Sequence, residues 1–312
     1  MPPIHIGDYL IGGSIALLNH INSLVLCMDF IVYLLTRAFI GLVWLIPFRL
    51  LYILSDGLAY FLCYVLKYRR KIVESNLKRS GIEIPRLVDV YKNLCDIVLE
   101  SLKTPTISDT ALSERYVMKG IEICNNYNKE NISFVIAGAH MSNWEWAVLK
   151  FPMIYEGRTS GVYKPLNNKY LETYFSKVRS RTGMGLLAMK GSFEVMLKES
   201  RPSSFILVSD QNPSNVKRAH WVDFFGNDTA CLHGMSELAC EKKIPILYFE
   251  TMRDRRGYYT LTLSKLVDAD TDLKPVEITQ LFMKRVEKTI LKQPANWLWT
   301  HKRWKHKRKN IA

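Results

Sequence analysis

The sequence predicts an α/β fold with a mixed, largely parallel sheet flanked by helices, preceded by an N-terminal hydrophobic helical membrane segment. Short apolar runs rich in β-branched and aromatic residues recur along the chain, which is typical of strands buried on both faces of a parallel sheet. Stretches with helical spacing of apolar residues lie between these runs. The third observation is the apolar, nearly uncharged character of the first 66 residues.

This N-terminal part differs in composition from the rest of the chain. It holds two basic side chains, Arg37 and Arg49, against three acidic ones, so the formal net charge of +14 comes from the remainder. A basic body prefers polyanions such as nucleic acid, anionic lipid headgroups or an acidic carrier protein, and the apolar head favours lipid. We therefore expect membrane-associated helices over residues 1–66 and one globular domain over residues 67–312.

Three apolar stretches form the head. Residues 9–28 contain no Lys, Arg, Asp or Glu and match the ~20 residues that a helix needs to cross a bilayer. Residues 30–48 and 50–66 each carry a single charged residue. The basic cluster at residues 67–71 follows, and such clusters usually stay on the cytoplasmic side of a membrane. We expect one or two spans and a cytoplasmic body; the alternative is that some of these helices are buried core helices.

Several kinds of site are disfavoured by the sequence. The six cysteines show neither CxxC nor Cys/His metal spacing and are too dispersed for a small disulfide scaffold, so we expect reduced thiols and no metal or cofactor. Zinc spacing and RNP-like aromatic motifs are also missing from the sequence. A nucleic-acid-binding function would leave the apolar head without a role.

The best candidate for chemistry follows a predicted strand at residues 133–139. His140 stands at its carboxyl end, where open α/β sheets usually bind ligands. Ser142 or Asn143 can cap a helix that carries Glu145 on its first turn, from which the carboxylate can fold back to the imidazole. Such a pair suits hydroxyl acylation, because the histidine takes the hydroxyl proton and the carboxylate fixes its tautomer. The alternative is a structural histidine near a helix-start carboxylate.

A second predicted strand ends beside this site. The apolar run at residues 204–209 leads into Asp210 and Gln211, so these side chains should project from the same sheet edge as His140. The alternative is a turn that merely ends the strand. No serine or cysteine stands in a nucleophile-elbow context, which favours direct transfer over a covalent enzyme intermediate.

The run from His140 to Glu145 resembles the HX4D/E motif of the lysophospholipid acyltransferase superfamily, in its glutamate form. More closely, the sequence from about residue 45 to residue 305 resembles the bacterial lipid A biosynthesis (lauroyl/myristoyl) acyltransferase family. Four further blocks carry this resemblance: Ile46-Pro47-Phe48-Arg49 with Arg69-Arg70-Lys71; Val162-Tyr163-Lys164-Pro165-Leu166-Asn167-Asn168; Ser209-Asp210-Gln211-Asn212 with Phe224-Phe225-Gly226; and the tryptophan-rich residues 294–305.

The resemblance implies a glycerol-3-phosphate-acyltransferase-like fold and a reaction. The family moves a fatty acyl chain, usually from acyl carrier protein, to a hydroxyl of a lipid A precursor at the cytoplasmic face of the bacterial inner membrane. An acyl-CoA donor is the alternative. The acceptor also stays open, because a lysophospholipid, an aminolipid or another glycolipid would use the same chemistry.

The resemblance also implies roles for individual residues. His140 would be the general base and Glu145 its partner, while Asp210 and Gln211 would shape the pocket. The basic residues Lys164 and Arg179 would bind phosphate or the phosphopantetheine of the carrier, although Lys164 replaces an arginine of many relatives and acts as a point charge. From the residues themselves, Phe224-Phe225-Gly226 would line the acyl chain's route, with Gly226 giving close access to the backbone; the alternative is ordinary core and turn.

The C-terminal segment mixes aromatic and basic residues. Trp297, Trp299 and Trp304 alternate with six Lys and Arg residues up to residue 309. Aromatics at the interface and cations on headgroups would hold this edge against an anionic membrane surface. A non-catalytic membrane scaffold would explain the head and this tail, but not the His140 to Glu145 run.

Overall fold

The structure is a computed structural model that describes the backbone of residues 7–308, with side chains from Val25 onward. The helices are α1 (Gly7–Leu45), α2 (Phe48–Tyr60), α3 (Arg70–Ser80), α4 (Val88–Lys103), α5 (Asp109–Arg115), α6 (Ile121–Lys129), α7 (Glu145–Lys150), α8 (Lys169–Ser180), α9 (Ser192–Lys198), α10 (Gly234–Lys242) and α11 (Pro275–Lys292). Short helical turns are η1 (Phe61–Val65), η2 (Phe151–Met153), η3 (Val216–Arg218) and η4 (Pro294–Asn296). The strands are β1 (Tyr116–Lys119), β2 (Phe134–Gly138), β3 (Thr159–Tyr163), β4 (Gly185–Ala188), β5 (Ser204–Val208), β6 (His220–Phe224), β7 (Asn227–Cys231), β8 (Ile246–Arg255) and β9 (Tyr258–Val267).

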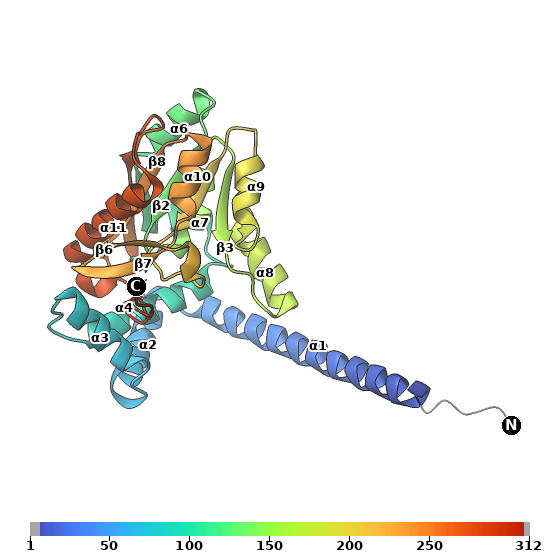
Figure 1. Cartoon of the computed structure of the whole chain (residues 1–312). Coiled ribbons are helices and arrows are strands. Elements are labelled where there is room, and N and C mark those ends of the chain that lie inside the picture. Colours follow the sequence, from blue (N-terminus) through green and yellow to red (C-terminus); the bar gives the residue numbers. More distant parts are fainter. Residues whose placement is uncertain (1–6, 309–312) are drawn as a thin grey trace.

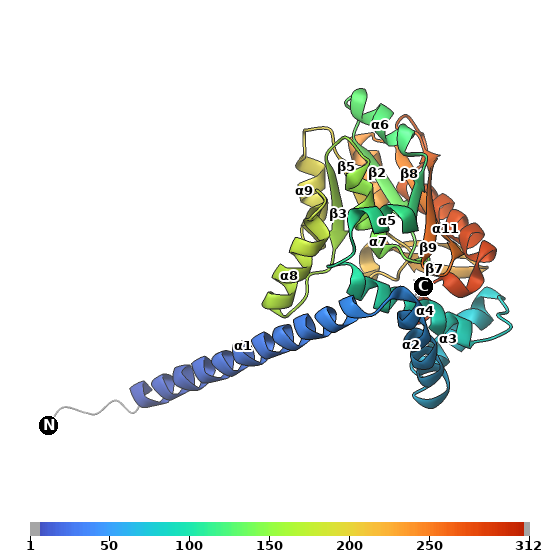
Figure 2. The same ribbon diagram turned by 180° about the vertical axis from the view of Figure 1, so that it is seen from behind.

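Seven strands form one sheet in the order β1-β9-β8-β2-β5-β3-β4. Every neighbouring pair is parallel except the antiparallel pair β8 and β9. Helices cover both faces, with α9, α10 and α11 on one side (Figure 1) and α5 and α7 on the other (Figure 2). The strands β6 and β7 pair only with each other, as a separate hairpin. The predicted α/β fold with a mixed, largely parallel sheet is therefore confirmed.

Strand β2 lies in the middle of the sheet, and all five of its residues are buried. Val135 and Ala137 pack into the core under α10 and α11, whereas Phe134 and Ile136 pack into the core under α6 and α7. A strand with a core on each face needs an uninterrupted apolar run rather than polar and apolar alternation. This explains the sequence pattern that identified the strand.

The N-terminal helices differ in number from the prediction. Helix α1 runs as one helix to Leu45 and extends away from the domain in both views (Figures 1 and 2). It joins the first two predicted stretches and ends just before Pro47, because proline disfavours a helical conformation at the residue before it. Two segments, Val25–Leu45 and Phe48–Val65, are long and apolar enough to cross a membrane by length and composition.

Helix α2 has two unlike faces. Its buried face, with Leu51, Ser55 and Ala59, lies against the domain, where α2 and α4 are in extensive contact. The opposite face exposes Ile53 at 66% and Leu54 at 55% of their surface. Helix α2 therefore packs on the body while presenting apolar side chains outward.

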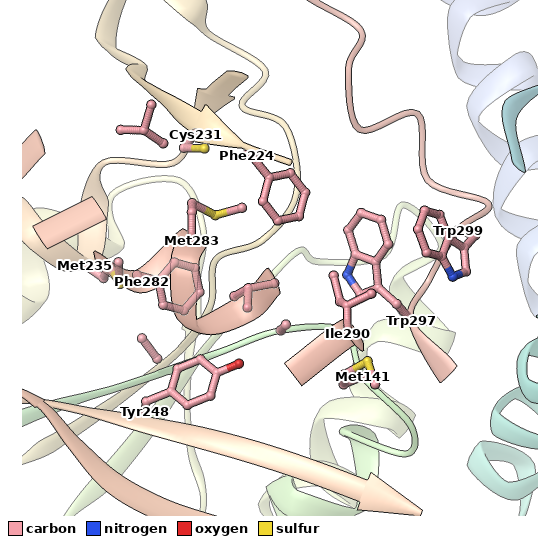
Figure 3. Close-up of a cluster of buried hydrophobic side chains, with 14 of the residues drawn as sticks. Met141, Phe224, Cys231, Met235, Tyr248, Phe282, Met283, Ile290, Trp297 and Trp299 are labelled. Carbon is pink, nitrogen blue, oxygen red and sulfur yellow. The ribbon is translucent and has the colours of Figure 1, made fainter. Parts of the chain in front are cut away.

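The C-terminal tryptophans are not at the surface. Trp297, Trp299 and Trp304 are 2%, 0% and 7% exposed and belong to the core cluster that contains Phe224. Figure 3 shows Trp297 and Trp299 in this cluster, and Trp304 stacks on Phe224. Arg303 is also buried and donates from Nη1 to the carbonyl of Ala230 (2.7 Å). The predicted membrane-facing role of these tryptophans is wrong, because the segment folds back against the β6–β7 hairpin and fills the core there.

Candidate active site

Two side chains meet where β2 and β5 end. These strands are parallel neighbours with Gly138 opposite Val208, so His140 and Asp210 follow them at the same edge of the sheet. Nδ1 of His140 lies 2.6 Å from Oδ1 of Asp210, and the backbone N–H of His140 donates to Oδ2 of Asp210 (3.1 Å). The carboxylate therefore fixes both the imidazole and the backbone that carries it.

Asp210 is 1% exposed, yet it is held as a carboxylate. Burial disfavours its charged form, but attraction to His140 and hydrogen bonds from His140 and Trp297 keep the pKa of Asp210 below its ordinary value. Because an ionised carboxylate only accepts hydrogen bonds, Nδ1 of His140 carries the proton and Nε2 is left free to accept one. The side chain of His140 is 18% exposed, so substrate can reach it.

The chain after His140 is fastened to the C-terminal segment. Leu298 N donates to the His140 carbonyl (3.2 Å), and Ser142 N donates to the Asn296 carbonyl (2.9 Å). Trp297 forms a β-bridge with Met141, and its indole Nε1 donates to Oδ2 of Asp210 (2.7 Å). Figure 3 shows the side chains of Met141 and Trp297 close together. The segment predicted to contact the membrane thus supports the site from inside.

Glu145 lies beside Arg179 and not against His140, where it was expected. It is the first residue of α7, and its carboxylate is 3.8 Å from the guanidinium of Arg179 on α8. Within the described residues no hydrogen bond joins it to His140. The expected and the observed positions of Glu145 differ for two reasons. Asp210 already binds Nδ1 of His140, and the cation of Arg179 attracts the Glu145 carboxylate. Glu145 and Arg179 line a pocket between α7 and α8.

An apolar pocket with a cavity volume of about 50 Å³ lies between α7 and the sheet. Trp144 lines it and also contacts the imidazole, with ring centroids 4.8 Å apart. The other lining residues are all apolar and come from α7, η2, six strands and the end of the loop before β4: Met118, Ile136, Ala147, Val148, Phe151, Gly161, Met184, Ile206, Val208, Phe249, Leu261 and Leu263. The lining is therefore chemically suited to hydrocarbon, and Trp144 links it to the imidazole.

The remaining predicted site residues are placed as follows. Lys164 follows β3 and is exposed, and it forms no ion pair with the residues that the structure describes. Gln211 adjoins Asp210 and is half-buried. Gly226 is exposed and has φ +72° in the turn between β6 and β7, after Phe225 at φ 50°. The two-residue hairpin turn explains this glycine, because both of its positions need positive φ.

Sequence reasoning missed the roles of Trp297 and His301. Nε2 of His301 accepts a hydrogen bond from Asn212 N (3.2 Å), two residues after Asp210. Burial, Arg303 and the nearby His140 together lower the pKa of His301 to about 4. It is therefore neutral at physiological pH. The available signal was the C-terminal block of the resemblance, which contains both residues.

The fold and the site define an α/β enzyme with a histidine–carboxylate pair beside an apolar pocket. A family model described as bacterial lipid A biosynthesis acyltransferase matches residues 20–306, and the chain belongs to this family. It is therefore an acyltransferase.

Named relatives agree at low identity. The chain is 24% identical to the lipid A biosynthesis lauroyltransferase of Escherichia coli (strain K12) over 286 residues, which cover 88% of this chain and 92% of that protein. It is 25% identical to a lipid A biosynthesis acyltransferase of Haemophilus influenzae, over 83% of this chain and 86% of the relative. It is 20% identical to the lipid A biosynthesis palmitoleoyltransferase of Escherichia coli (strain K12), over 88% of this chain and 92% of that protein.

Proposed function

We propose that the protein transfers a fatty acyl chain from an acyl thioester to a hydroxyl group of a lipid A precursor. The observation that carries the proposal is the contact between His140 and Asp210, which leaves Nε2 of the imidazole free to accept a proton. Membership of the lipid A acyltransferase family supplies the class of acceptor.

The reaction follows from the free nitrogen. Nε2 of His140 takes the proton of the acceptor hydroxyl as its oxygen attacks the thioester carbonyl carbon. The tetrahedral intermediate collapses, the carbon–sulfur bond breaks, and the thiolate takes the proton back from the imidazolium. Asp210 holds the tautomer and stabilises the imidazolium in between, so it takes the orienting part that the sequence predicted for Glu145.

Part of the acyl chain would occupy the apolar pocket under α7. Trp144 supports this assignment because its ring contacts His140 on one side and lines the pocket on the other. A chain inserted there would present its thioester carbonyl to the imidazole. Burial of methylene groups stabilises the complex by ~0.8 kcal/mol each.

Basic residues would recognise the charged ends of the substrates. Arg179 is 27% exposed beside Glu145 and can bind a phosphate oxygen, while Glu145 holds its guanidinium in place. Lys164 follows β3, at the same edge of the sheet as Asp210, and its exposed ammonium suits a phosphate of the acceptor or of phosphopantetheine. The net charge of +14 favours acyl carrier protein, an acidic partner, as the donor.

The N-terminal helices would place the enzyme on the bacterial inner membrane. Val25–Leu45 has a mean hydropathy of 1.9, and only 6% of its most apolar 18-residue window is buried. The outward face of α2 is also apolar. The basic cluster of Lys67, Arg69, Arg70 and Lys71 comes directly after these helices and favours the cytoplasmic face.

Mass spectrometry of total lipids tests this function. Cells that lack the gene should accumulate a lipid A species lighter by one acyl chain, and the wild-type gene should restore the full mass. A gene encoding His140→Ala should not restore it. Unchanged lipid A, together with loss of an acyl chain from a phospholipid or an aminolipid, would instead assign a different acceptor.

A further inference from the structure

Glu100 is a buried acidic residue in the last turn of α4, and it makes no hydrogen bond to His140 among the described residues. It is 0% exposed and accepts three hydrogen bonds from side chains. Tyr52 donates to Oε1 (2.8 Å), while Tyr259 (2.8 Å) and Nδ2 of Asn143 (2.6 Å) donate to Oε2. These donors come from α2, from β9 and from the loop between His140 and Glu145.

Asn143 uses both ends of its amide. Nδ2 donates to Glu100, and Oδ1 accepts from the backbone N–H of Trp146 (3.1 Å), which caps the start of α7. The orientation of the amide is determined by Trp146, because a backbone N–H only donates and so must meet the amide oxygen, which leaves Nδ2 facing Glu100. Asn143 is 0% exposed, so water cannot replace either bond. The carboxylate of Glu100 therefore sets the position of the loop at its midpoint.

The loop needs such an anchor because its backbone is irregular. Ser142 adopts φ 50°, in the left-handed region that a non-glycine residue rarely occupies. Upstream of Ser142, Asp210 and Leu298 bind the backbone of His140, and downstream the next side-chain attachment is Asn143. A loop released at Asn143 would let Trp144 and Glu145 move relative to the imidazole, whereas the hydrogen bond between His140 and Asp210 would persist.

We propose that Glu100 is a positioning residue, which acts through Asn143 to hold the loop from His140 to Glu145 in the geometry required for acyl transfer. Because Tyr52 of α2 binds the same carboxylate, the apolar helix α2 belongs to this framework. The proposal rests on the proposed function, since its main readout is the rate of acyl transfer. Glu100 touches no substrate and acts only by fixing the loop.

Exchanging the two polar groups tests the proposal. Asn143→Asp keeps the cap on Trp146 but sets a second carboxylate against Glu100. In the double variant Glu100→Gln/Asn143→Asp, the new amide donates to the new carboxylate, so the bond is restored with donor and acceptor reversed. Tyr52 still has the Gln oxygen to donate to, and the hydroxyl of Tyr259 can rotate to accept. Glu250→Gln, which removes a half-buried charge contacting Lys292 and Thr289, serves as the matched control.

At about pH 8, Asn143→Asp should lower kcat at least about tenfold with little change in KM, and the double variant should recover most of that loss. Glu250→Gln should keep the wild-type kcat. A double variant no more active than Asn143→Asp would overturn the proposal, and so would an Asn143→Asp enzyme with the wild-type kcat. If Asn143→Asp does not fold, a folded but inactive double variant would also overturn it. A wild-type enzyme without activity on the lipid A precursor would refute the proposed function instead.

Discussion

Nδ1 of His140 and Oδ1 of Asp210 are 2.6 Å apart, although the two residues are separated by 70 positions in the chain. Adjacent parallel strands, β2 and β5, bring them together, and the indole of Trp297 binds the second oxygen of the same carboxylate. The protein thus has a buried carboxylate on one nitrogen of a partly exposed imidazole. This arrangement leads to predictions that separate the roles of the two acidic residues near the histidine.

Asp210→Asn should lower kcat on the order of 10² to 10⁴-fold, because an amide no longer fixes the tautomer with Nε2 free. Both carboxylate oxygens of Asp210 accept N–H donors, so the NH₂ group of the new Asn side chain would face an N–H of His140 or Trp297. Steady-state kinetics on the purified variant, with its circular dichroism spectrum as a check on folding, measures this. A folded variant with nearly wild-type kcat would exclude Asp210 from the mechanism.

Glu145→Gln should reduce kcat much less than Asp210→Asn, because Glu145 contacts Arg179 rather than the imidazole. Arg179→Ala should raise KM for a phosphorylated acceptor about tenfold or more, since a charge-assisted hydrogen bond to phosphate is lost. Comparing both variants with phosphorylated and dephosphorylated acceptors separates binding from chemistry. If Glu145→Gln were as inactive as His140→Ala, the sequence-based role of Glu145 as the partner of His140 would be restored.

Trp297→Phe should destabilise the protein by about 2 kcal/mol and lower kcat, because it removes a hydrogen-bond donor to a buried charge while keeping an aromatic ring. Trp299→Phe is the matched control, since the indole of Trp299 donates to the neutral carbonyl of Pro294. It should cost about 1 kcal/mol and leave kcat unchanged. Urea denaturation measures the free energies of unfolding. Equal kcat values for the two variants would show that the Trp297 bond has no part in the site.

His301→Gln should make the protein less sensitive to mild acid. The pKa of His301 is lowered from 6.5 to about 4, so the unfolded state binds more protons between these two values. The free energy of unfolding is therefore fully retained above the unfolded pKa and falls as the pH decreases, by up to about 1.4 kcal/mol per pH unit. Asp210, with a pKa below its ordinary value, loses its stabilising effect only at lower pH.

Denaturation midpoints from about pH 7 to about pH 5 compare the two proteins. The Gln oxygen can still accept the bond from Asn212, so stability at neutral pH should change little. Identical pH dependence of the wild type and His301→Gln would mean that His301 is not the residue that titrates.

The sequence predicted the strands better than the contacts between them. The apolar runs of β2 and β5 were recognised because β2 is buried on both faces and β5 packs against both cores, and this placed His140 and Asp210 at one sheet edge. Their direct contact depends on β5 being the neighbour of β2, with β3 and β4 outside it, and strand order does not appear in local periodicity. The motif and the family resemblance favoured Glu145, the nearer carboxylate in the chain.

The C-terminal segment shows a different limit. Tryptophans interleaved with lysines have the composition of a membrane-interface segment. Whether such a segment lies on a membrane or in a core depends on the tertiary surface available to it. Here the β6–β7 hairpin offers Phe224 for stacking with Trp304 and the Thr229 hydroxyl for its indole N–H. No pattern within residues 297–304 contains that information.

Acyl transfer by purified protein, followed by mass spectrometry of the lipid product, tests most directly whether His140 is the general base. The wild-type enzyme, supplied with an acyl carrier protein thioester and a lipid A precursor, should add one acyl chain, and Asp210→Asn should do so far more slowly. His140→Ala, folded by circular dichroism, should give no product above background. Product formation by His140→Ala at the wild-type rate would show that the imidazole of His140 is not the general base.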